Sequence, residues 1–289
     1  MTSSIKRLYA TLAFVLALGL LVAGCGSSDD ETSGSETTAS ASCEPGELET
    51  VSAGALTVAT DKPAYPPYFE DDDPTNGEGF ESAVAYAIAD QLGYPAAKVK
   101  WTVEPFNSSY APGPKKFDFD VNQISITPAR EKAVDFSTPY YTANQAVLAL
   151  KDSDAAKATD LEELQDAQLG VQIGTTSLEA AEEVIEPSDK PEVFNNSTDV
   201  TTALKNGQID AIVVDLPTAL YLTAVEIPEA TVVGQFSAPG GDQWGALLAK
   251  DSALTPCVSE AVEELESSGE LEEITTKWMS QSAGAPVLE

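Results

Sequence analysis

The sequence predicts an α/β protein of two lobes, each a sheet flanked by helices, with two strands crossing between the lobes. From Leu48 onward, short β-rich runs alternate with helical patterns, which is typical of βαβ units and a parallel sheet. This rhythm occurs twice, on either side of an apolar segment, AVLALKDSD at 146–154, and a segment of similar character, DQWGALLAKDS, follows at 242–252. If both segments are strands that run between lobes, the chain leaves the first lobe, builds the second and returns.

The elements of the first lobe are predicted in chain order. ALTVAT at 55–60 is a strand, GFESAVAYAIADQLG at 79–93 is a helix, and VKWTVEPF at 99–106 and FDVNQISI at 119–126 are further strands. We expect this first part of the lobe to extend over residues 44–148.

The second lobe, expected over 149–240, starts with a strand at 167–174 and a helix at 175–185 whose leading Thr or Ser is an N-cap signal. Residues 200–224 then predict a helix, a turn, a buried strand and another helix. Residues 241–289 are expected to form the hinge return and C-terminal helices that pack on the first lobe, with Trp278 as an anchor.

Composition excludes several classes of function. The chain has 289 residues, and its 47 acidic against 15 basic residues give a net charge of -32, so it offers little to a nucleic-acid backbone. It contains no histidine, which excludes Ser-His-Asp triads and His-ligated metal sites. We expect no cofactor, no metal site and no nucleic-acid partner.

The first 24 residues place Lys6 and Arg7 before an apolar run, the order of a secretory signal peptide. The run ends LVAGC, which resembles a bacterial lipobox with Cys25 as the lipidated residue. A signal-anchor helix is the alternative, but the run is shorter than the roughly 20 residues that a span needs. Residues 25–43 are rich in Gly, Ser, Thr and acids and predict a flexible tether.

Cys43 and Cys257 are the other two cysteines. An exported protein can pair them in an oxidising compartment, so we predict a disulfide, with two separate buried thiols as the alternative.

Arg130 is the main candidate for ligand binding. It follows a predicted strand closely, and ligands bind at that end of strands in open α/β sheets. With Ser125 and Thr127 nearby, its planar guanidinium suits a carboxylate. On position alone, a surface salt bridge to Glu131 or Asp135 is equally compatible.

The segment ISITPAREKAVDFSTPYY at 124–141 resembles one shared by the extracellular solute-binding proteins of polar amino-acid ABC importers (family 3). The likeness extends in the family's order to five further blocks, LTVATDKPAYPPYFE, GFESAVAYAIADQLG, LGVQIGTTSLEA, GQIDAIVVDLPTA and GELEEITTKWM. It implies a type II periplasmic-binding-protein fold with two hinge strands, closing on one amino acid.

The resemblance also implies roles for individual residues. Arg130, helped by Ser125 and Thr176, would hold the ligand's α-carboxylate, and Asp215 would take its α-ammonium. Asp61, Tyr65 and Phe106 would contact the side chain, although both aromatics could equally belong to the core. Asn122 and Gln123 stand where the family more often has small residues, and with Asp61 they favour a polar or cationic side chain.

The function implied is a monomeric, lipid-anchored receptor on the outer face of the cell membrane that delivers an amino acid to an ABC permease. It requires no catalysis. The alternatives are a sensor that passes the closed state to a signalling partner, and a dehydratase or lyase on the same fold. Such an enzyme would need Glu70 or Glu104 as its acid or base.

Overall fold

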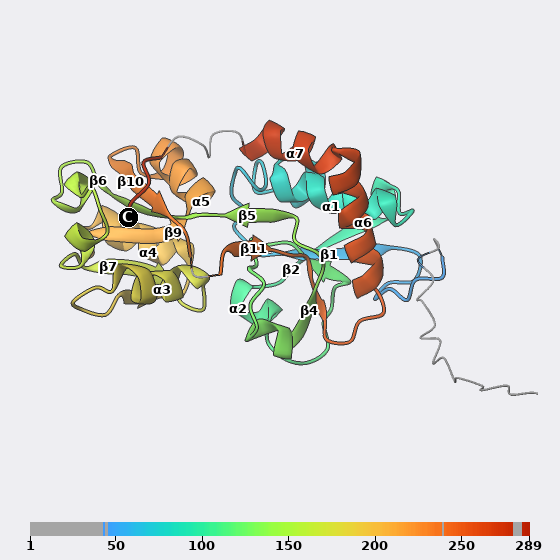
Figure 1. Ribbon diagram of the computed structural model, residues 1–289. Helices are drawn as coiled ribbons and strands as arrows, with labels where there is room; N and C mark the ends of the chain where they lie inside the picture. Colours follow the sequence, from blue (N-terminus) through green and yellow to red (C-terminus); the bar gives the residue numbers. More distant parts are fainter. Residues whose placement is uncertain (1–42, 44–45, 239, 280–284) are drawn as a thin grey trace, which may run out of the picture. The chain divides into compact units, whose positions relative to one another are not determined.

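The computed structural model describes residue 43 and residues 46–238, 240–279 and 285–289. The predicted signal peptide, Cys25 and the tether up to residue 42 lie outside the described residues. In the described part of the chain, two five-stranded sheets each carry helices on their faces, and a two-stranded ribbon lies between the sheets (Figure 1).

The first sheet belongs to the first lobe. Its strands are, in spatial order, β2 (Val99–Val103), β1 (Leu56–Thr60), β3 (Phe119–Asp120), β12 (Leu247–Ala249) and β4 (Val134–Phe136). Helices α1 (Phe80–Gln91), α6 (Thr255–Ser268) and α7 (Glu270–Met279) pack together and share one core with this sheet (Figure 1). Trp278 is partly buried against that core, as an anchor would be. A short helix, α2 (Phe106–Ser109), follows β2.

The second sheet has the spatial order β10 (Ala230–Phe236), β6 (Gln145–Leu150), β9 (Ala211–Asp215), β7 (Leu169–Gln172) and β8 (Glu192–Phe194). Alternate residues of β6 pack on opposite faces, Val147 and Ala149 on one side and Ala146 and Leu148 on the other. The first face is covered by α3 (Thr176–Ala180), and the second by α4 (Ser197–Lys205) and α5 (Leu216–Tyr221). Both faces of β6 are buried, which explains why its sequence is a continuous apolar run.

The two lobes are connected by β5 (Tyr141–Ala143) and β11 (Asp242–Trp244), which pair antiparallel. The two predicted crossings are therefore present, but the first was placed wrongly: the crossing strand precedes 146–154. Residues 145–150 already form β6 at the centre of the second lobe, so the boundary expected at 148 falls inside a strand of that lobe.

Both sheets are mixed, so the predicted parallel pairing holds for only some of the strands, including β7 with β8 and β9. In the first lobe β1 runs parallel to β2 and β3, but β12 is antiparallel to β3 and β4 because the chain re-enters this lobe from the second one. In the second lobe β6 is antiparallel to both β9 and β10.

The last described residues also depart from the prediction, which assigned all of 241–289 to the hinge and the first lobe. Leu288 is buried in the core of the second lobe, and its amide donates to the Gln235 carbonyl of β10 (2.8 Å). A Cβ on Gly234 would lie 2.5 Å from the Leu288 side chain, so this glycine makes room for the C-terminal contact.

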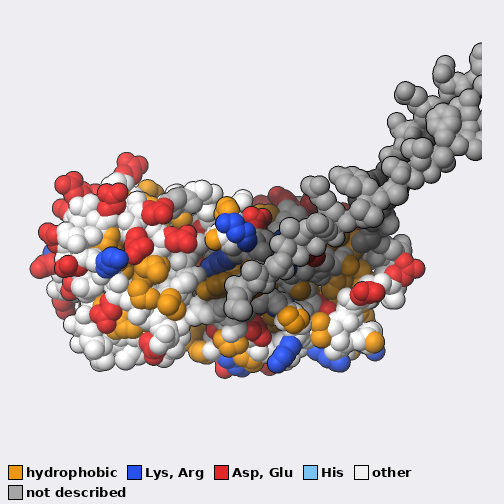
Figure 2. All heavy atoms as spheres, turned by 90° about the horizontal axis from the view of Figure 1, so that it is seen from below, with side chains coloured by type: hydrophobic (Ala, Val, Ile, Leu, Met, Phe, Trp, Pro, Cys, Tyr) orange, Lys and Arg blue, Asp and Glu red, His pale blue; other side chains and the backbone are white. Residues whose placement is uncertain are grey.

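No helix in the described part of the chain is long and apolar enough to cross a membrane. Figure 2 shows Asp and Glu side chains spread over the face in view, with fewer Lys and Arg side chains between them.

Cys43 and Cys257 form a disulfide, which confirms the prediction. The bond joins the start of the described domain to α6, whose Cys257 is buried in the core of the first lobe. Their sequence separation is 214 residues, so in the chain-entropy model the bond removes much conformational freedom from the unfolded chain.

Replacing both Cys43 and Cys257 by Ser is therefore expected to lower the free energy of unfolding by up to about 5 kcal/mol. Urea unfolding of the variant and of the parent, each with and without reductant, measures this loss. Reductant should destabilise only the parent. Equal stabilities, with both thiols open to alkylation in the native parent, would contradict the expectation.

Candidate ligand-binding cleft

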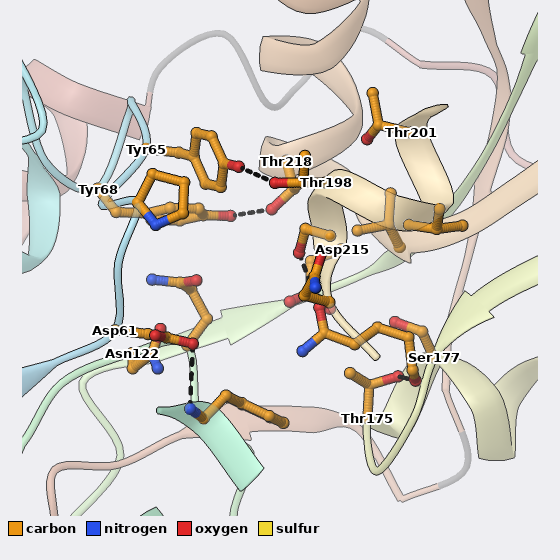
Figure 3. Close-up of a pocket in the computed structure, with 18 of the residues that line it drawn as sticks. Asp61, Tyr65, Tyr68, Asn122, Thr175, Ser177, Thr198, Thr201, Asp215 and Thr218 are labelled. Carbon is orange, nitrogen blue, oxygen red and sulfur yellow. Dashed lines mark hydrogen bonds between the residues drawn. The ribbon is translucent and has the colours of Figure 1, made fainter. Parts of the chain in front are cut away.

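One cavity of about 550 Å³ is lined by residues of both lobes. On the first-lobe side its walls come from the loop after β1, the start of α2 and the segment after β3. On the second-lobe side they come from the starts of α3, α4 and α5. The residues concerned follow the carboxyl ends of strands, the usual place for ligands in open α/β sheets. Figure 3 shows Tyr65 and Tyr68 facing Thr198 and Thr218 across this cavity.

Arg130 is buried, with 8% of its surface exposed, and its guanidinium lies in the cavity wall. It donates to the carbonyl of Ser125 (2.6 Å) and, across the cleft, to the carbonyl of Gly174 (2.9 Å). The rings of Tyr110 and Phe106 lie 4.9 and 5.5 Å from its central carbon, which adds cation–π stabilisation. Burial lowers the pKa of Arg130. Among the described residues it forms no ion pair, so the salt bridge to Glu131 or Asp135 is not made; Asp135 pairs with Lys250 instead.

Hydroxyl groups from both lobes meet beside Arg130. The Ser125 and Thr176 hydroxyl oxygens are 3.2 Å apart, and Thr176 also donates to Asp242 Oδ2 (3.0 Å). Thr176 is the first residue of α3, and the preceding Thr175 caps that helix by accepting from the Leu178 amide (3.3 Å).

Asp215 lies on the second-lobe wall, where β9 ends and α5 begins. Its Oδ1 accepts a hydrogen bond from Gln145 Nε2 (2.6 Å), and the same nitrogen donates to Asp242 Oδ2 (2.5 Å). Burial raises the pKa of Asp215 well above its ordinary value, and the neighbouring Asp242 raises it further.

Asp61 and two aromatic side chains line the opposite, first-lobe part of the cavity. Asp61 accepts from the amides of Lys62 (2.7 Å) and Phe106 (3.1 Å). Tyr65 and Phe106 are half-buried and line the cavity, so neither belongs wholly to the core. Tyr65 reaches across the cleft to the Thr198 hydroxyl (3.0 Å) and to the Tyr221 ring, whose centroid is 5.9 Å away (Figure 3).

Asn122 and Gln123 form part of the cavity floor. Asn122 is buried, and its side-chain nitrogen has no partner among the described residues, so it is a donor available to a ligand. Gln123 is engaged elsewhere: its backbone amide (2.7 Å) and its side-chain nitrogen both donate to the carboxyl of Glu81. These bonds support the left-handed backbone of Gln123, at φ 48°.

Residues 56–281 match the family of bacterial extracellular solute-binding proteins, family 3. The chain belongs to this family. The arginine-binding extracellular protein of Bacillus subtilis (strain 168) is 31% identical over 217 residues, covering 73% of this chain and 82% of that protein.

Two solved structures of an ancestral arginine-binding protein are similar to this solute-binding protein. One is bound to glutamine and the other to arginine, and they are 31% and 32% identical to this chain. Each has a TM-score of 0.66 and matches 78% of this chain, with 97% and 98% of their own length covered. The two-lobed α/β fold predicted from the sequence is thereby confirmed.

The solute-binding protein's cavity contains most of the residues predicted to bind ligand. They are Arg130, Asp215, Ser125, Thr176, Asp61, Tyr65, Phe106 and Gln123. Thr127 is outside this set and lines a smaller hollow behind Arg130. Its hydroxyl accepts from the Arg130 amide (3.2 Å), so its contact in the structure is with the turn that carries the arginine.

Several residues of this cleft were not predicted. Tyr68, Thr198 and Thr218 contribute contacts between the lobes, and Tyr68 bonds the Thr218 hydroxyl at 2.7 Å. Gln145 and Asp242 lie behind Asp215. Both residues lie at the ends of the crossing segments. Because the crossing strands pass the floor of the cleft, this position could have identified them as cleft residues.

Glu81 gives the protein a pH-dependent stability. Burial raises its pKa to about 7, against opposing hydrogen bonds from Tyr140 (2.5 Å) and Gln123. A carboxyl with a raised pKa in the folded state binds more protons there than in the unfolded chain. It therefore makes unfolding free energy fall as pH rises from about 4.5 to about 7.

For Glu81→Gln, which stays neutral throughout, we expect this contribution to disappear. Between about pH 4 and pH 8 the parent should lose roughly 3 kcal/mol more stability than the variant, as follows from a shift of about 2.5 pKa units. Chemical unfolding across this range measures the difference. Glu78→Gln, an exposed change nearby, should follow the parent's curve. Parallel curves for parent and Glu81→Gln would refute the assignment.

Proposed function

We propose that this protein is the receptor of an ABC importer, which captures an amino acid by closure of its two lobes and delivers it to a membrane permease. A lipid on Cys25 would tether it to the outer face of the membrane. The observation that carries the proposal is that one cavity receives the Arg130 guanidinium from one lobe and the Asp215 carboxyl from the other. Two relatives support it by their names, an arginine-binding extracellular protein and an ABC transporter glutamine-binding protein, both of Bacillus subtilis (strain 168).

The two charges match the two ends of an amino acid. A guanidinium with no carboxylate partner in the described structure can form a fork of parallel hydrogen bonds with the α-carboxylate. Asp215 can accept from the α-ammonium. Because these groups belong to different lobes, one zwitterion can bind both only when the lobes are together, and the ligand's binding energy favours closure.

The remaining cavity groups favour a cationic or polar ligand side chain. Asp61 adds a carboxylate beyond Asp215, and Asn122 adds a buried amide donor. The rings of Tyr65 and Phe106 can stack on a flat or cationic group. A structure similar to this one is available with arginine and another with glutamine, two amino acids of this kind.

Thermal melting of the purified protein with each standard amino acid at about 1 mM tests the function. A ligand with a micromolar dissociation constant should add about 4 kcal/mol of stability. We expect the largest shift from arginine, lysine or glutamine. If no α-amino acid changes the melt, the proposal fails.

For Arg130→Ala we expect a loss of binding affinity of about 100-fold or more, because the ligand carboxylate would be buried without its partner. Calorimetric titration measures the loss. Lys132→Ala removes an exposed cation from the same turn and should leave affinity unchanged. Near-normal affinity in Arg130→Ala would remove this residue from the site.

Asp215→Asn should weaken the amino acid far more than its deamino analogue, which keeps the carboxylate but lacks the ammonium. The reason is that only the ammonium loses its charged acceptor. Calorimetric titration of both ligands gives the two ratios. Equal losses for both ligands would contradict the ammonium role of Asp215.

A further inference from the structure

The wall that carries Asp215 contains a second carboxyl, Asp242, from the crossing strand β11. It is buried, with 1% of its surface exposed. Gln145 Nε2 donates to both carboxyls, at 2.6 Å to Asp215 and 2.5 Å to Asp242, so one amide nitrogen bridges the two carboxyls. We call Asp215 and Asp242 the acidic pair, and Gln145 is its bridging amide.

The acidic pair has no cation of its own. Among the described residues neither carboxyl forms an ion pair with a lysine or arginine. Asp242 Oδ1 has no hydrogen-bond partner in that part of the chain. Two carboxylates in one buried site repel each other strongly, so a protein normally supplies a cation or keeps one of the two protonated.

The groups that face the pair from every side leave it short of positive charge. Gln145 of β6 and Thr176 of α3 are neutral donors, and Tyr68 across the cleft is a neutral phenol whose pKa is raised by burial and then by Asp215. Arg130 is the cation that acts on the pair, and its field lowers the pKa of Asp215. Arg130 itself donates its hydrogen bonds to carbonyl groups. The negative charge of Glu179 in α3 also acts on its guanidinium.

We propose that Asp215 and Asp242 together form the ammonium subsite, sharing one proton while the cleft is empty and releasing it to solvent when a ligand ammonium binds. This inference rests on the proposed function. No covalent bond changes except the O–H bond of the shared proton, which passes to buffer. The ligand's positive charge then lies beside Asp215, which lines the cavity, and Gln145 holds both carboxyls in position.

The sign of the pH dependence follows from the proton balance. The empty pair carries one proton and the occupied pair none, so affinity rises with pH by up to about tenfold per unit until the empty pair loses its proton. Above that point affinity becomes independent of pH. Asp242 acts through Asp215 and the hydroxyl of Thr176, and is a positioning residue for the ligand.

The test is calorimetric titration of the purified protein with L-arginine and L-glutamine, in buffers of different ionisation enthalpy, between about pH 5 and pH 8. The dependence of the measured heat on buffer gives the number of protons released. We expect close to one proton per ligand at the acidic end, falling toward zero as pH rises. Asp242→Asn removes the repulsion but leaves Asp215 buried, so proton release should fall away at a lower pH than in the parent.

Asp152→Asn is the matched control, because it makes the same change at an exposed position of the second lobe and should release protons as the parent does. Heats of the parent that do not depend on buffer would overturn the inference, and this arm needs no variant to fold. Equal proton release by Asp242→Asn and the parent would also overturn it. If neither ligand nor any other α-amino acid binds the parent, the proposed function fails with it, whereas binding without proton release refutes the acidic pair alone.

Discussion

The cleft is organised by buried charged groups that form no ion pair within the described protein. Arg130 is buried in one wall with its guanidinium bonded to carbonyls, and Asp215 and Asp242 are buried in the other, joined by an amide. Each arrangement costs desolvation energy that a zwitterionic ligand would offset on both sides at once. The rest of the fold can be understood as support for these groups, since a rigid sheet in each lobe fixes one of the two charged walls.

The crossing ribbon carries part of this support. β5 and β11 connect the lobes, yet Asp242 of β11 and Gln145, which begins β6 just after β5, also form the floor beneath Asp215. Hinge and binding site therefore share residues. If the proposal holds, a change in the protonation or occupancy of the acidic pair would act directly on the backbone about which the lobes would move, without a longer chain of contacts.

Sequence reasoning found the fold and most of the cavity because those signals are local. Strand and helix periodicity is contained in short windows. The SITPAR segment carries Arg130, at the start of a short 3-10 helix, and the AIVVDLP segment carries Asp215, at the end of β9. It missed Asp242, Gln145 and Tyr68 because their roles depend on partners between 70 and 150 residues away. The antiparallel strand of the first sheet was missed for the same reason: β12 is antiparallel because the chain returns from the other lobe.

The contacts between the lobes are few, as the proposed ligand-dependent closure requires. Beside the Arg130 bond to Gly174 they are mainly hydroxyl pairs, Tyr65 with Thr198, Tyr68 with Thr218 and Ser125 with Thr176. A neutral hydrogen bond exchanged with water contributes only about 1 kcal/mol net, so a few such bonds define the closed geometry without fixing it. Under the proposed function, a ligand that satisfies buried charges on both walls would add to these bonds and would shift the lobes toward closure.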